Sequence, residues 1–456
     1  MSNDRDRSDT RSIPFGGEWT VPDEAGVKRR TIVQGAAWTV PVVAAAVASP
    51  LAAASTTPTY TLAFDQDEYP VGSDCTLKGV TLTLRDNAGA PAAGQTVTTT
   101  LPAGWTFAGG GRTYSTTTDA NGLVTLPTIT ATKGAGTFTL NSSAPAVNAS
   151  DTATADIDSQ PNLWEYNSEN GKRYKLTRLP AGTATALGGG YFQLENGDIY
   201  DYRSSTPVVR GAGKAVGYSG QNGNYYVDYI SSTGVASTRN LNTGTTRTYP
   251  WVPSSANPVG GGFFLGTGGA LWGYNQQTRI ASGVTSASGY ISADDTNYWV
   301  DFVNASGTQT YNANTGLTTV YNSSLTAATA VGSGYFLQSN GVLRYRNEVK
   351  ATNVKSAVGY PSATTANAVY FADYVTNDGR AFFASSATSS TSLPNVPLNS
   401  SPRGGGYFLA GDQLWSYQGG GRLIASNVDN AVGYPGAAGT NRRYWSDYVI
   451  KPSSCI

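Results

Sequence analysis

The sequence contains no histidine among its 456 residues. Histidine provides the base of the common nucleophilic triads, many zinc ligands and most proton transfer near neutral pH, so these kinds of chemistry are excluded. Catalysis would have to use carboxylates, tyrosine or lysine instead. The absence favours a protein that binds over one that catalyses, and we expect no cofactor and no metal.

Charge is scarce as well. Charged residues make up 13% of the chain, and 30 basic residues balance 30 acidic ones. Without an extended basic block, neither nucleic acid nor an anionic membrane surface is a favoured partner. The chain is instead rich in glycine (54) and tyrosine (28), a composition typical of β-strands joined by tight turns. We therefore predict an all-β fold.

The chain has a single long apolar stretch, from Gly35 to Leu51, and it follows a polar segment, residues 1–27. A basic cluster lies between the two, and small residues follow the stretch. This order resembles a twin-arginine signal peptide, which implies export. The residues that carry the resemblance are an arginine pair and a small-x-small cleavage site: Arg29, Arg30, Ala52 and Ala54.

The export segment departs from the twin-arginine pattern at Lys28, which replaces Ser or Thr, and at Gln34, which replaces Lys. An uncleaved membrane anchor is the alternative, because a segment of about 20 residues is long enough to cross a bilayer. Its tryptophan, its proline and its many alanines make it a poor permanent span. We expect residues 1–54 to be a signal peptide with a polar extension, and the mature protein to be secreted or displayed at the cell surface without a permanent span.

The chain has only two cysteines, Cys75 and Cys455. In an exported protein such a pair favours a disulfide, and two unpaired buried thiols are the alternative. A bond between them would tie the first mature domain to the C-terminus. On a chain-entropy account, so long a loop would contribute up to about 4–5 kcal/mol of stability.

The first mature domain, residues 55–158, consists of short alternating segments separated by turn clusters, which predicts an antiparallel sandwich. Three phrases within it are more specific: Leu82–Val97, Thr117–Val124 and Ala135–Leu140. Their content and order resemble the bacterial immunoglobulin-like group 1 domain of invasin-type surface proteins. The resemblance implies a spacer module without chemistry of its own.

The remaining residues, 159–456, repeat one pattern four times with a period of 72 residues. Three anchors recur in every copy. The first is an aromatic residue within a Gly-aromatic-Phe phrase, namely Tyr191, Phe263, Tyr335 and Tyr407. The second is a Gly-Tyr pair that begins at Gly217, Gly289, Gly359 and Gly433. The third is an aspartate between aromatic residues, namely Asp228, Asp301, Asp373 and Asp447. Self-similarity at a fixed period predicts a repeat architecture.

Each 72-residue unit divides into two halves of about 36 residues with three or four short strands, which is the size of a small propeller blade. The last copy ends after Tyr448 without its final hairpin, and the missing piece precedes the first copy, near Trp164. This split predicts a ring completed by strands from both termini. We predict a closed β-propeller of about eight blades, with seven blades or four larger ones as alternatives, and it resembles no specific propeller family.

The recurring aspartates and the aromatic residues beside them are predicted to be structural, the first as hydrogen-bond acceptors and the second as packing between blades. Function is expected where the copies differ, in the four loops that follow the Gly-Tyr anchors. These loops have 6, 7, 9 and 9 residues and are predicted to emerge on one face of the ring. The candidate ligand-binding residues in or beside them are Asn222, Asn224, Asp294, Asp295, Asn297, Trp299, Arg442, Arg443 and Trp445.

The sequence thus predicts an exported adhesion or binding protein whose propeller loops recognise an extracellular glycan or protein. The alternative is a glycoside hydrolase or polysaccharide lyase, since a pair of carboxylates suffices for glycosidic hydrolysis. Its candidate acids are Glu195, Asp198, Asp201, Asp294, Asp295, Glu348 and Asp412. An envelope scaffold without a soluble ligand is a third possibility.

Overall fold

A computed structural model describes residues 58–456 except for short gaps, at 73, 135, 159, 181, 221–223, 275, 293–295, 364–368, 418–419, 437–443, 454 and 456. Throughout these described residues the secondary structure is β-strand, apart from one short 3-10 helix, Pro145–Val147. The all-β prediction is confirmed. No helix in the described ranges is long and apolar enough to cross a membrane. The predicted export residues Arg29, Arg30, Ala52 and Ala54 lie outside the described residues.

The first part of the described chain forms three sheets around a core that includes the fully buried Trp105. One sheet contains β1 (Tyr60–Phe64), β4 (Thr81–Asp86) and β8 (Leu123–Thr125). The second contains β2 (Glu68–Pro70), β11 (Ala149–Ile157), β10 (Gly136–Ala144), β5 (Thr96–Thr100) and β7 (Thr113–Thr117). The third contains β3 (Thr76–Leu77), β9 (Ile129–Thr130) and β6 (Thr106–Phe107).

The second part of the chain forms eight small sheets, and most of them are consecutive antiparallel strands. The first two repeats give β14 (Ala184–Gly188), β15 (Tyr191–Leu194) and β16 (Ile199–Asp201); β17 (Lys214–Ser219), β18 (Tyr225–Ile230), β19 (Ala236–Asn240) and β20 (Thr246–Tyr249); β21 (Asn257–Gly260), β22 (Phe263–Leu265), β23 (Leu271–Gly273) and β24 (Gln276–Ala281); and β25 (Ser286–Ile291), β26 (Tyr298–Asn304), β27 (Gly307–Asn312) and β28 (Leu317–Asn322).

The remaining repeats follow the same plan. They give β29 (Ala328–Gly332), β30 (Tyr335–Gln338), β31 (Leu343–Tyr345) and β32 (Glu348–Ala351); β33 (Val354–Pro361), β34 (Tyr370–Thr376), β35 (Ala381–Ser385) and β36 (Thr391–Ser392); β37 (Ser401–Gly404), β38 (Tyr407–Ala410), β39 (Gln413–Ser416) and β40 (Arg422–Ala425); and a sheet ordered β13 (Lys172–Lys175), β12 (Asn162–Asn167), β42 (Tyr444–Ile450) and β41 (Val428–Pro435).

The sheet that contains β12 and β42 joins the two ends of the repeat region. The two strands pair in antiparallel register, with Trp164 opposite Tyr448 and Glu165 opposite Asp447. The rings of Trp164 and Tyr448 stack with their centroids 6.4 Å apart. The predicted meeting of these segments is confirmed, and the sheet edge that each would otherwise expose is covered.

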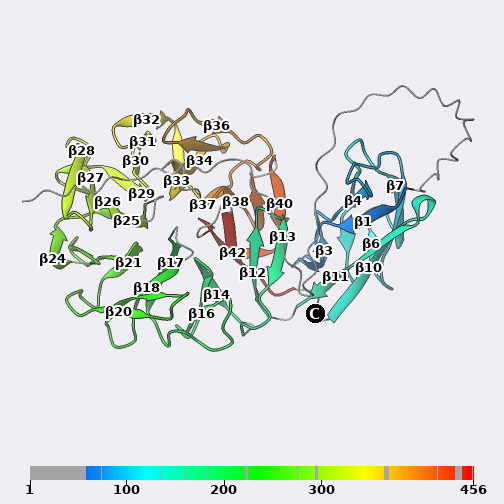
Figure 1. The fold of residues 1–456 in the computed structure, drawn as a ribbon, viewed down its shortest axis with the longest axis horizontal. Coiled ribbons are helices and arrows are strands. Elements are labelled where there is room, and N and C mark those ends of the chain that lie inside the picture. Colours follow the sequence, from blue (N-terminus) through cyan, green and yellow to red (C-terminus); the bar gives the residue numbers. More distant parts are fainter. Residues whose placement is uncertain are drawn as a thin grey trace, which may run out of the picture. The chain divides into compact units, whose positions relative to one another are not determined.

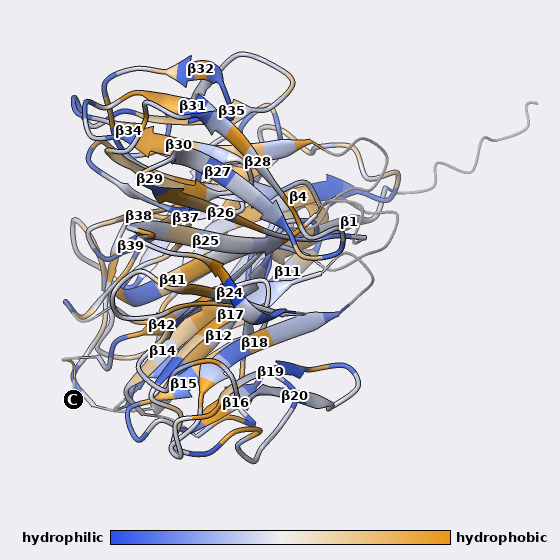
Figure 2. Cartoon of the chain, turned by 90° about the vertical axis from the view of Figure 1, so that its left-hand side faces the viewer, coloured by the Kyte–Doolittle hydropathy of each residue, from blue (hydrophilic) through white to orange (hydrophobic). Residues whose placement is uncertain are grey.

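The first strand of each sheet contacts the first strand of the next sheet along the chain, from β14 to β37. The series continues from β37 to β41 and from β41 back to β14. The eight sheets are therefore arranged about a common centre, as Figure 1 shows. In Figure 2, hydrophobic residues follow many of the strands, whereas hydrophilic residues lie mostly at strand ends and turns.

The Gly-Tyr anchors mark the closest approaches between neighbouring sheets. A Cβ atom added to Gly289 on β25 would lie 2.0 Å from the carbonyl oxygen of Gly260 on β21. The same contact recurs in the other repeats, where Gly217, Gly359 and Gly433 approach Gly188, Gly332 and Gly404. Only glycine permits backbones to approach so closely, which explains why the anchor is invariant among the four copies.

Several contacts join the first three sheets to the repeat region, among them a disulfide and a cluster of ion pairs. Cys75 and Cys455 form a disulfide with their Cα atoms 5.2 Å apart, in line with the predicted bond. The ammonium group of Lys175, on β13, lies 2.9 Å from a carboxylate oxygen of Asp156 and 3.1 Å from one of Asp158. These carboxylates raise the pKa of the Lys175 amine above its usual value, so the amine stays charged.

Candidate functional site

The four recurring aspartates are fully buried and bind the neighbouring sheet. Asp301 accepts hydrogen bonds from the Tyr290 hydroxyl at 3.4 Å, from the Thr310 hydroxyl at 2.5 Å and from the backbone N–H of Gly334 at 2.6 Å. Gly334 belongs to the next sheet. The other three carboxyl groups receive the equivalent N–H in the pairs Asp228 with Gly262, Asp373 with Gly406 and Asp447 with Gly190. The predicted structural role of these residues is confirmed.

The aspartate bonds and the glycine contacts alternate around the eight sheets. Each aspartate joins the second sheet of one repeat to the first sheet of the next, and each Gly-Tyr glycine joins the two sheets within a repeat. Burial raises the pKa of each of the four carboxyl groups to about 7, although hydroxyl and N–H donors oppose the shift. These acids therefore hold the framework and are not open to a ligand.

Five of the nine predicted ligand residues, Asn222, Asp294, Asp295, Arg442 and Arg443, lie outside the described residues. Two of the others, Asn224 and Asn297, are half-buried at strand ends. The Asn224 side chain accepts a hydrogen bond from Asn240 at 3.1 Å, and Asn297 accepts the equivalent bond from Asn312 at 3.0 Å. The same amide–amide bond recurs in two repeats. We therefore interpret it as a structural contact at the strand ends, next to the loops.

The aromatic residues beside the loops, which include the candidates Trp299 and Trp445, are half-buried. Two of their counterparts stack on the tyrosine of the Gly-Tyr anchor: Tyr226 on Tyr218, with centroids 5.6 Å apart, and Phe371 on Tyr360, at 5.8 Å. For Tyr226 and Phe371 this stacking partner lies on the neighbouring strand of the same sheet, and the predicted packing between blades stays a prediction.

A cavity of about 250 Å³ opens beside these aromatic residues, at the loop end of the strands. Its lining comes from three successive sheets: the β17–β20 sheet, Tyr274 after β23, and Tyr298 at the start of β26. The residues that line it are Tyr218, Tyr226, Thr238, Asn240, Thr245, Thr246, Arg247, Tyr249, Tyr274 and Tyr298. Sequence analysis did not find this cavity, because its walls come from different repeats.

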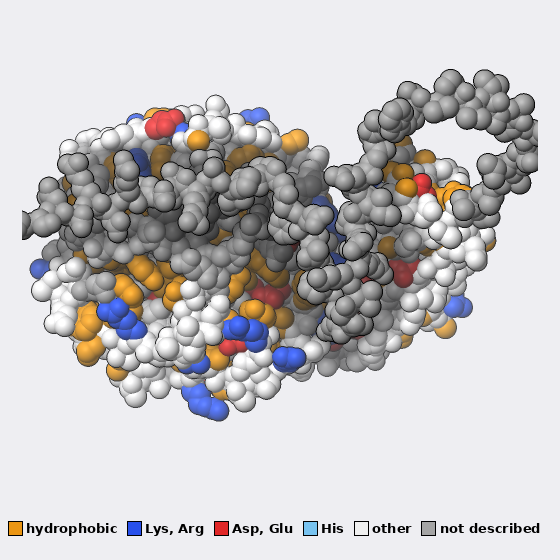
Figure 3. Space-filling model, in the orientation of Figure 1, with side chains coloured by type: hydrophobic (Ala, Val, Ile, Leu, Met, Phe, Trp, Pro, Cys, Tyr) orange, Lys and Arg blue, Asp and Glu red, His pale blue; other side chains and the backbone are white. Residues whose placement is uncertain are grey.

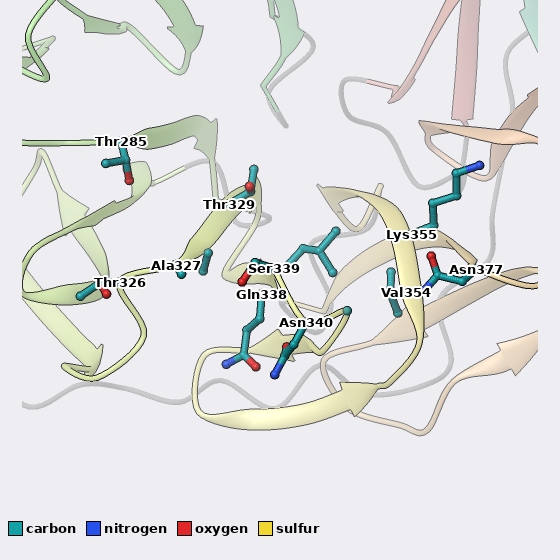
Figure 4. A pocket seen from close by; sticks show the side chains of 13 residues that line it. Thr285, Thr326, Ala327, Thr329, Gln338, Ser339, Asn340, Val354, Lys355 and Asn377 are labelled. Atoms are coloured by element: carbon teal, nitrogen blue, oxygen red, sulfur yellow. The ribbon is translucent and has the colours of Figure 1, made fainter.

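A larger cavity, of about 620 Å³, lies at the opposite strand ends, where β25, β29 and β33 begin. Its lining is mostly Thr, Ser, Asn and Gln, with one cation, Lys355. Figure 4 shows Gln338, Ser339 and Asn340 together on one side of it, and Lys355 and Asn377 on the other. This cavity has no aromatic residue and no carboxylate among its described lining residues, so it offers neither a stacking surface nor a general acid.

The described candidate acids of the hydrolase alternative have separate local partners, and none of them lines either of the two cavities. The Asp198 carboxylate accepts from the Gly211 N–H at 3.0 Å, Asp201 accepts from the Arg203 N–H at 2.8 Å, and Glu348 pairs with Lys350 at 2.8 Å. On the face that Figure 3 presents, charged side chains of the described residues are scattered, not gathered into a patch.

One buried acid pair was missed by sequence analysis. Glu165 and Asp447 are opposite each other on β12 and β42, with 6% and 0% of their surfaces exposed. Burial and the nearby Asp447 carboxyl raise the pKa of Glu165 well above its usual value. Glu165 occupies the position that the other repeats fill with Thr238, Thr310 and Phe383. Alignment of the segment near Trp164 with the other repeats would have placed Glu165 opposite the recurring aspartate.

No protein-family model matches the chain, and no curated protein is significantly similar to it in sequence. The resemblance of residues 55–158 to the invasin-type immunoglobulin-like family therefore stays a prediction. Solved structures that it resembles include an auxiliary nutrient binding protein from Bacteroides thetaiotaomicron, at 10% identity and a TM-score of 0.26 over 86% of this chain and 98% of that one.

Two further solved structures are similar at the same low level. The Aleuria aurantia lectin in complex with a fucosyl sugar has 14% identity and a TM-score of 0.25, over 55% of this chain and 93% of the lectin. Invasin, a bacterial integrin-binding protein, has 13% identity and a TM-score of 0.18, over 86% of this chain and 79% of invasin. Since all three scores are below 0.5, we base the functional proposal on the contacts of the chain itself.

Proposed function

We propose that the chain is an exported, non-catalytic binding protein in which an immunoglobulin-like spacer carries a closed eight-bladed β-propeller. The pairing of β12 with β42 and the alternating aspartate and glycine junctions support the closed ring. The signal-like N-terminus and the Cys75–Cys455 disulfide support a location outside the cytoplasm, secreted or at the cell surface. The ligand is an extracellular glycan or protein.

The observation that carries this proposal is the tyrosine-lined cavity at the loop end. Tyrosine faces offer apolar area at low entropic cost, and the Arg247 guanidinium beside them adds a positive charge. A concave apolar surface with a few polar groups is the usual form of a ligand site. The first of the loops whose lengths differ between repeats begins directly after Tyr218, and the second ends directly before Tyr298, so both adjoin lining residues.

The experiment is a screen of the full chain against arrayed glycans, cell-wall fragments and extracellular host proteins. We expect saturable binding to at least one member, and we expect Tyr226→Ala to weaken it at least tenfold. Lys355→Ala, in the cavity at the opposite end, is the matched control and should bind like the wild type. Uniformly negative results would remove the proposal, and equal weakening by both variants would move the site away from the loop end.

Non-catalytic binding is tested separately, by incubating the chain with each bound polysaccharide and measuring released reducing ends and unsaturated products. The separate local partners of the described acids support binding without cleavage. A retaining or inverting hydrolase would need two carboxyls about 5–9.5 Å apart facing one cavity. Product release that exceeds the buffer control would establish the hydrolase or lyase instead.

A further inference from the structure

Two stacked tyrosine pairs line the cavity at the loop end. Tyr218 and Tyr226 are nearly parallel, at an interplanar angle of 17°. Tyr298 and Tyr274 stack with centroids 4.5 Å apart and an angle of 11°, and the guanidinium carbon of Arg247 lies 4.2 Å from the centre of the Tyr274 ring. Arg247 thus continues the tyrosine stack as a third layer, which fixes the plane of its guanidinium group.

The hydroxyl groups deepest in the cavity already serve the framework. The Tyr249 hydroxyl donates to Thr238 at 3.0 Å, Thr238 donates to Asp228, and the Tyr218 hydroxyl donates to Asp228 at 3.0 Å. Asp228 is fully buried and lies behind the lining. Among the described lining residues Arg247 is the one charged group, and it belongs to an exposed part of β20. The described part of the lining therefore carries one positive charge, on the exposed strand β20.

We infer that this cavity binds a single sugar residue that carries a carboxylate, a hexuronic acid or a similar acidic pyranose. The inference rests on the proposed binding function and names its ligand class. The volume of about 250 Å³ is smaller than that of pockets for drug-sized ligands and suits one pyranose ring. The apolar face of the ring packs on the tyrosines, and the positive charge of Arg247 attracts the carboxylate.

A second repeat builds a related cluster from a different residue. Tyr321 and Tyr345 take the places of Tyr249 and Tyr274, but the position 72 residues after Arg247 is a threonine. Arg346 supplies the cation instead, and its guanidinium carbon lies 5.7 Å from the Tyr321 ring centre and 5.1 Å from that of Tyr345. Since simple repetition of the sequence does not place these two arginines, their common position between two tyrosines points to a requirement for charge there.

The other two repeats lack this arrangement. In the third repeat Phe383 replaces the threonine and its ring stacks on Tyr417, with centroids 5.1 Å apart. In the fourth repeat Glu165 occupies the position of that threonine, opposite Asp447. Among the described residues, an arginine over two tyrosines from neighbouring sheets is therefore found in the first two repeats and not in the other two. A polymeric acidic glycan that reached both would gain avidity.

The test uses calorimetric titration of the full chain with tetrasaccharides of glucuronic, galacturonic and mannuronic acid, each beside its carboxyl-reduced neutral form. We expect at least one acidic tetrasaccharide to bind at least tenfold more tightly than its neutral form, with an affinity that falls as salt is raised. Arg247→Met should lower that affinity at least tenfold without changing the melting temperature. Arg279→Met, at an exposed position on β24, is the matched control and should bind like the wild type.

Three results would overturn the inference: equal affinity for acidic and neutral forms, wild-type affinity in Arg247→Met, or no saturable binding by any tetrasaccharide. Tyr298→Leu adds a check on the stacking wall and should also weaken binding. Failure here is distinguishable from failure of the proposed function. If the glycan or protein found in the broad screen still binds to Arg247→Met, the binding function stands and the acidic-sugar site does not.

Discussion

At the scale of single residues, the main feature is a carboxyl group buried at the same place in every repeat. Its recurrence predicted a structural role, and hydrogen bonds to the next sheet confirm it. The sequence pattern could not show which group donates, because Gly262 and its equivalents come from the following repeat. Nor could it show that Asn224 and Asn297 pair with Asn240 and Asn312. An asparagine beside a loop gives the same sequence pattern whether its amide binds a ligand or a neighbouring side chain.

The raised pKa values predict how stability depends on pH. A carboxyl with a folded-state pKa of about 7, against about 4 when unfolded, keeps its proton in the folded protein while the unfolded chain loses it. The stabilising contribution of these groups is complete below pH 4 and is lost as the pH rises to about 7. Differential scanning calorimetry from pH 4 to pH 8 should show the melting temperature falling as the pH rises from about 4 to about 7.

Asp301→Asn isolates one of these groups. The amide of asparagine would face the donors of Thr310 and Gly334, so we expect a loss of about 1–3 kcal/mol at pH 4.5 in denaturant titrations. The difference from the wild type should narrow at pH 7.5, where the wild-type carboxyl begins to ionise at a cost. Asp412→Asn, at an exposed turn, should have no effect. A difference that widens with pH would mean that the buried carboxyl is ionised throughout.

At the scale of strands and sheets, two devices alternate between neighbours: a glycine contact within each repeat and an aspartate bond between repeats. The sequence predicted the strands and their grouping into half-repeats, because strand periodicity and turn residues are local signals. It could not predict the cavity at the loop end, whose walls come from three sheets. Contacts between sheets depend on how strands twist and pack, which no local pattern encodes.

The glycine contact gives a sharp prediction. Gly289→Ala would place a methyl group 2.0 Å from the Gly260 carbonyl oxygen and force two backbones apart, with an expected loss of about 1–3 kcal/mol or more. Gly213→Ala is the matched control, because nothing lies within 4 Å of its Cβ position and its backbone conformation suits alanine. Urea denaturation of both variants measures the difference. Equal stability would show that these sheets are not packed as closely as described.

At the scale of the whole described chain, the pairing of its two ends is the organising feature. The split repeat in the sequence predicted that Trp164 and Tyr448 would meet, and the register of β12 and β42 bears this out. The pairing of Cys75 with Cys455 was predicted from cysteine number and export, not from geometry. The ligand had no comparable signal, because no repeated pattern marks its site and five of the nine candidate residues lie outside the described residues.

Removal of the disulfide should destabilise the protein. Cys455→Ser opens a loop that spans 380 residues, so we expect a loss of up to about 4–5 kcal/mol and a lower melting temperature. The double variant Cys75→Ser and Cys455→Ser should behave like the single one, because both lack the same bond. Dithiothreitol should lower the melting temperature of the wild type and leave that of the double variant unchanged. If dithiothreitol left the melting temperature of the wild type unchanged, the result would contradict the disulfide.

The most direct test of the ring is native-state hydrogen exchange, followed by mass spectrometry of peptides that cover β12 and β42. If these strands complete one sheet, their amides should be protected as strongly as those of β18, β26 and β34, and Trp164→Ala should lower the protection of β12 and β42 together. Rapid exchange of β12 while the central strands stay protected would contradict the closed arrangement on which the proposed binding surface depends.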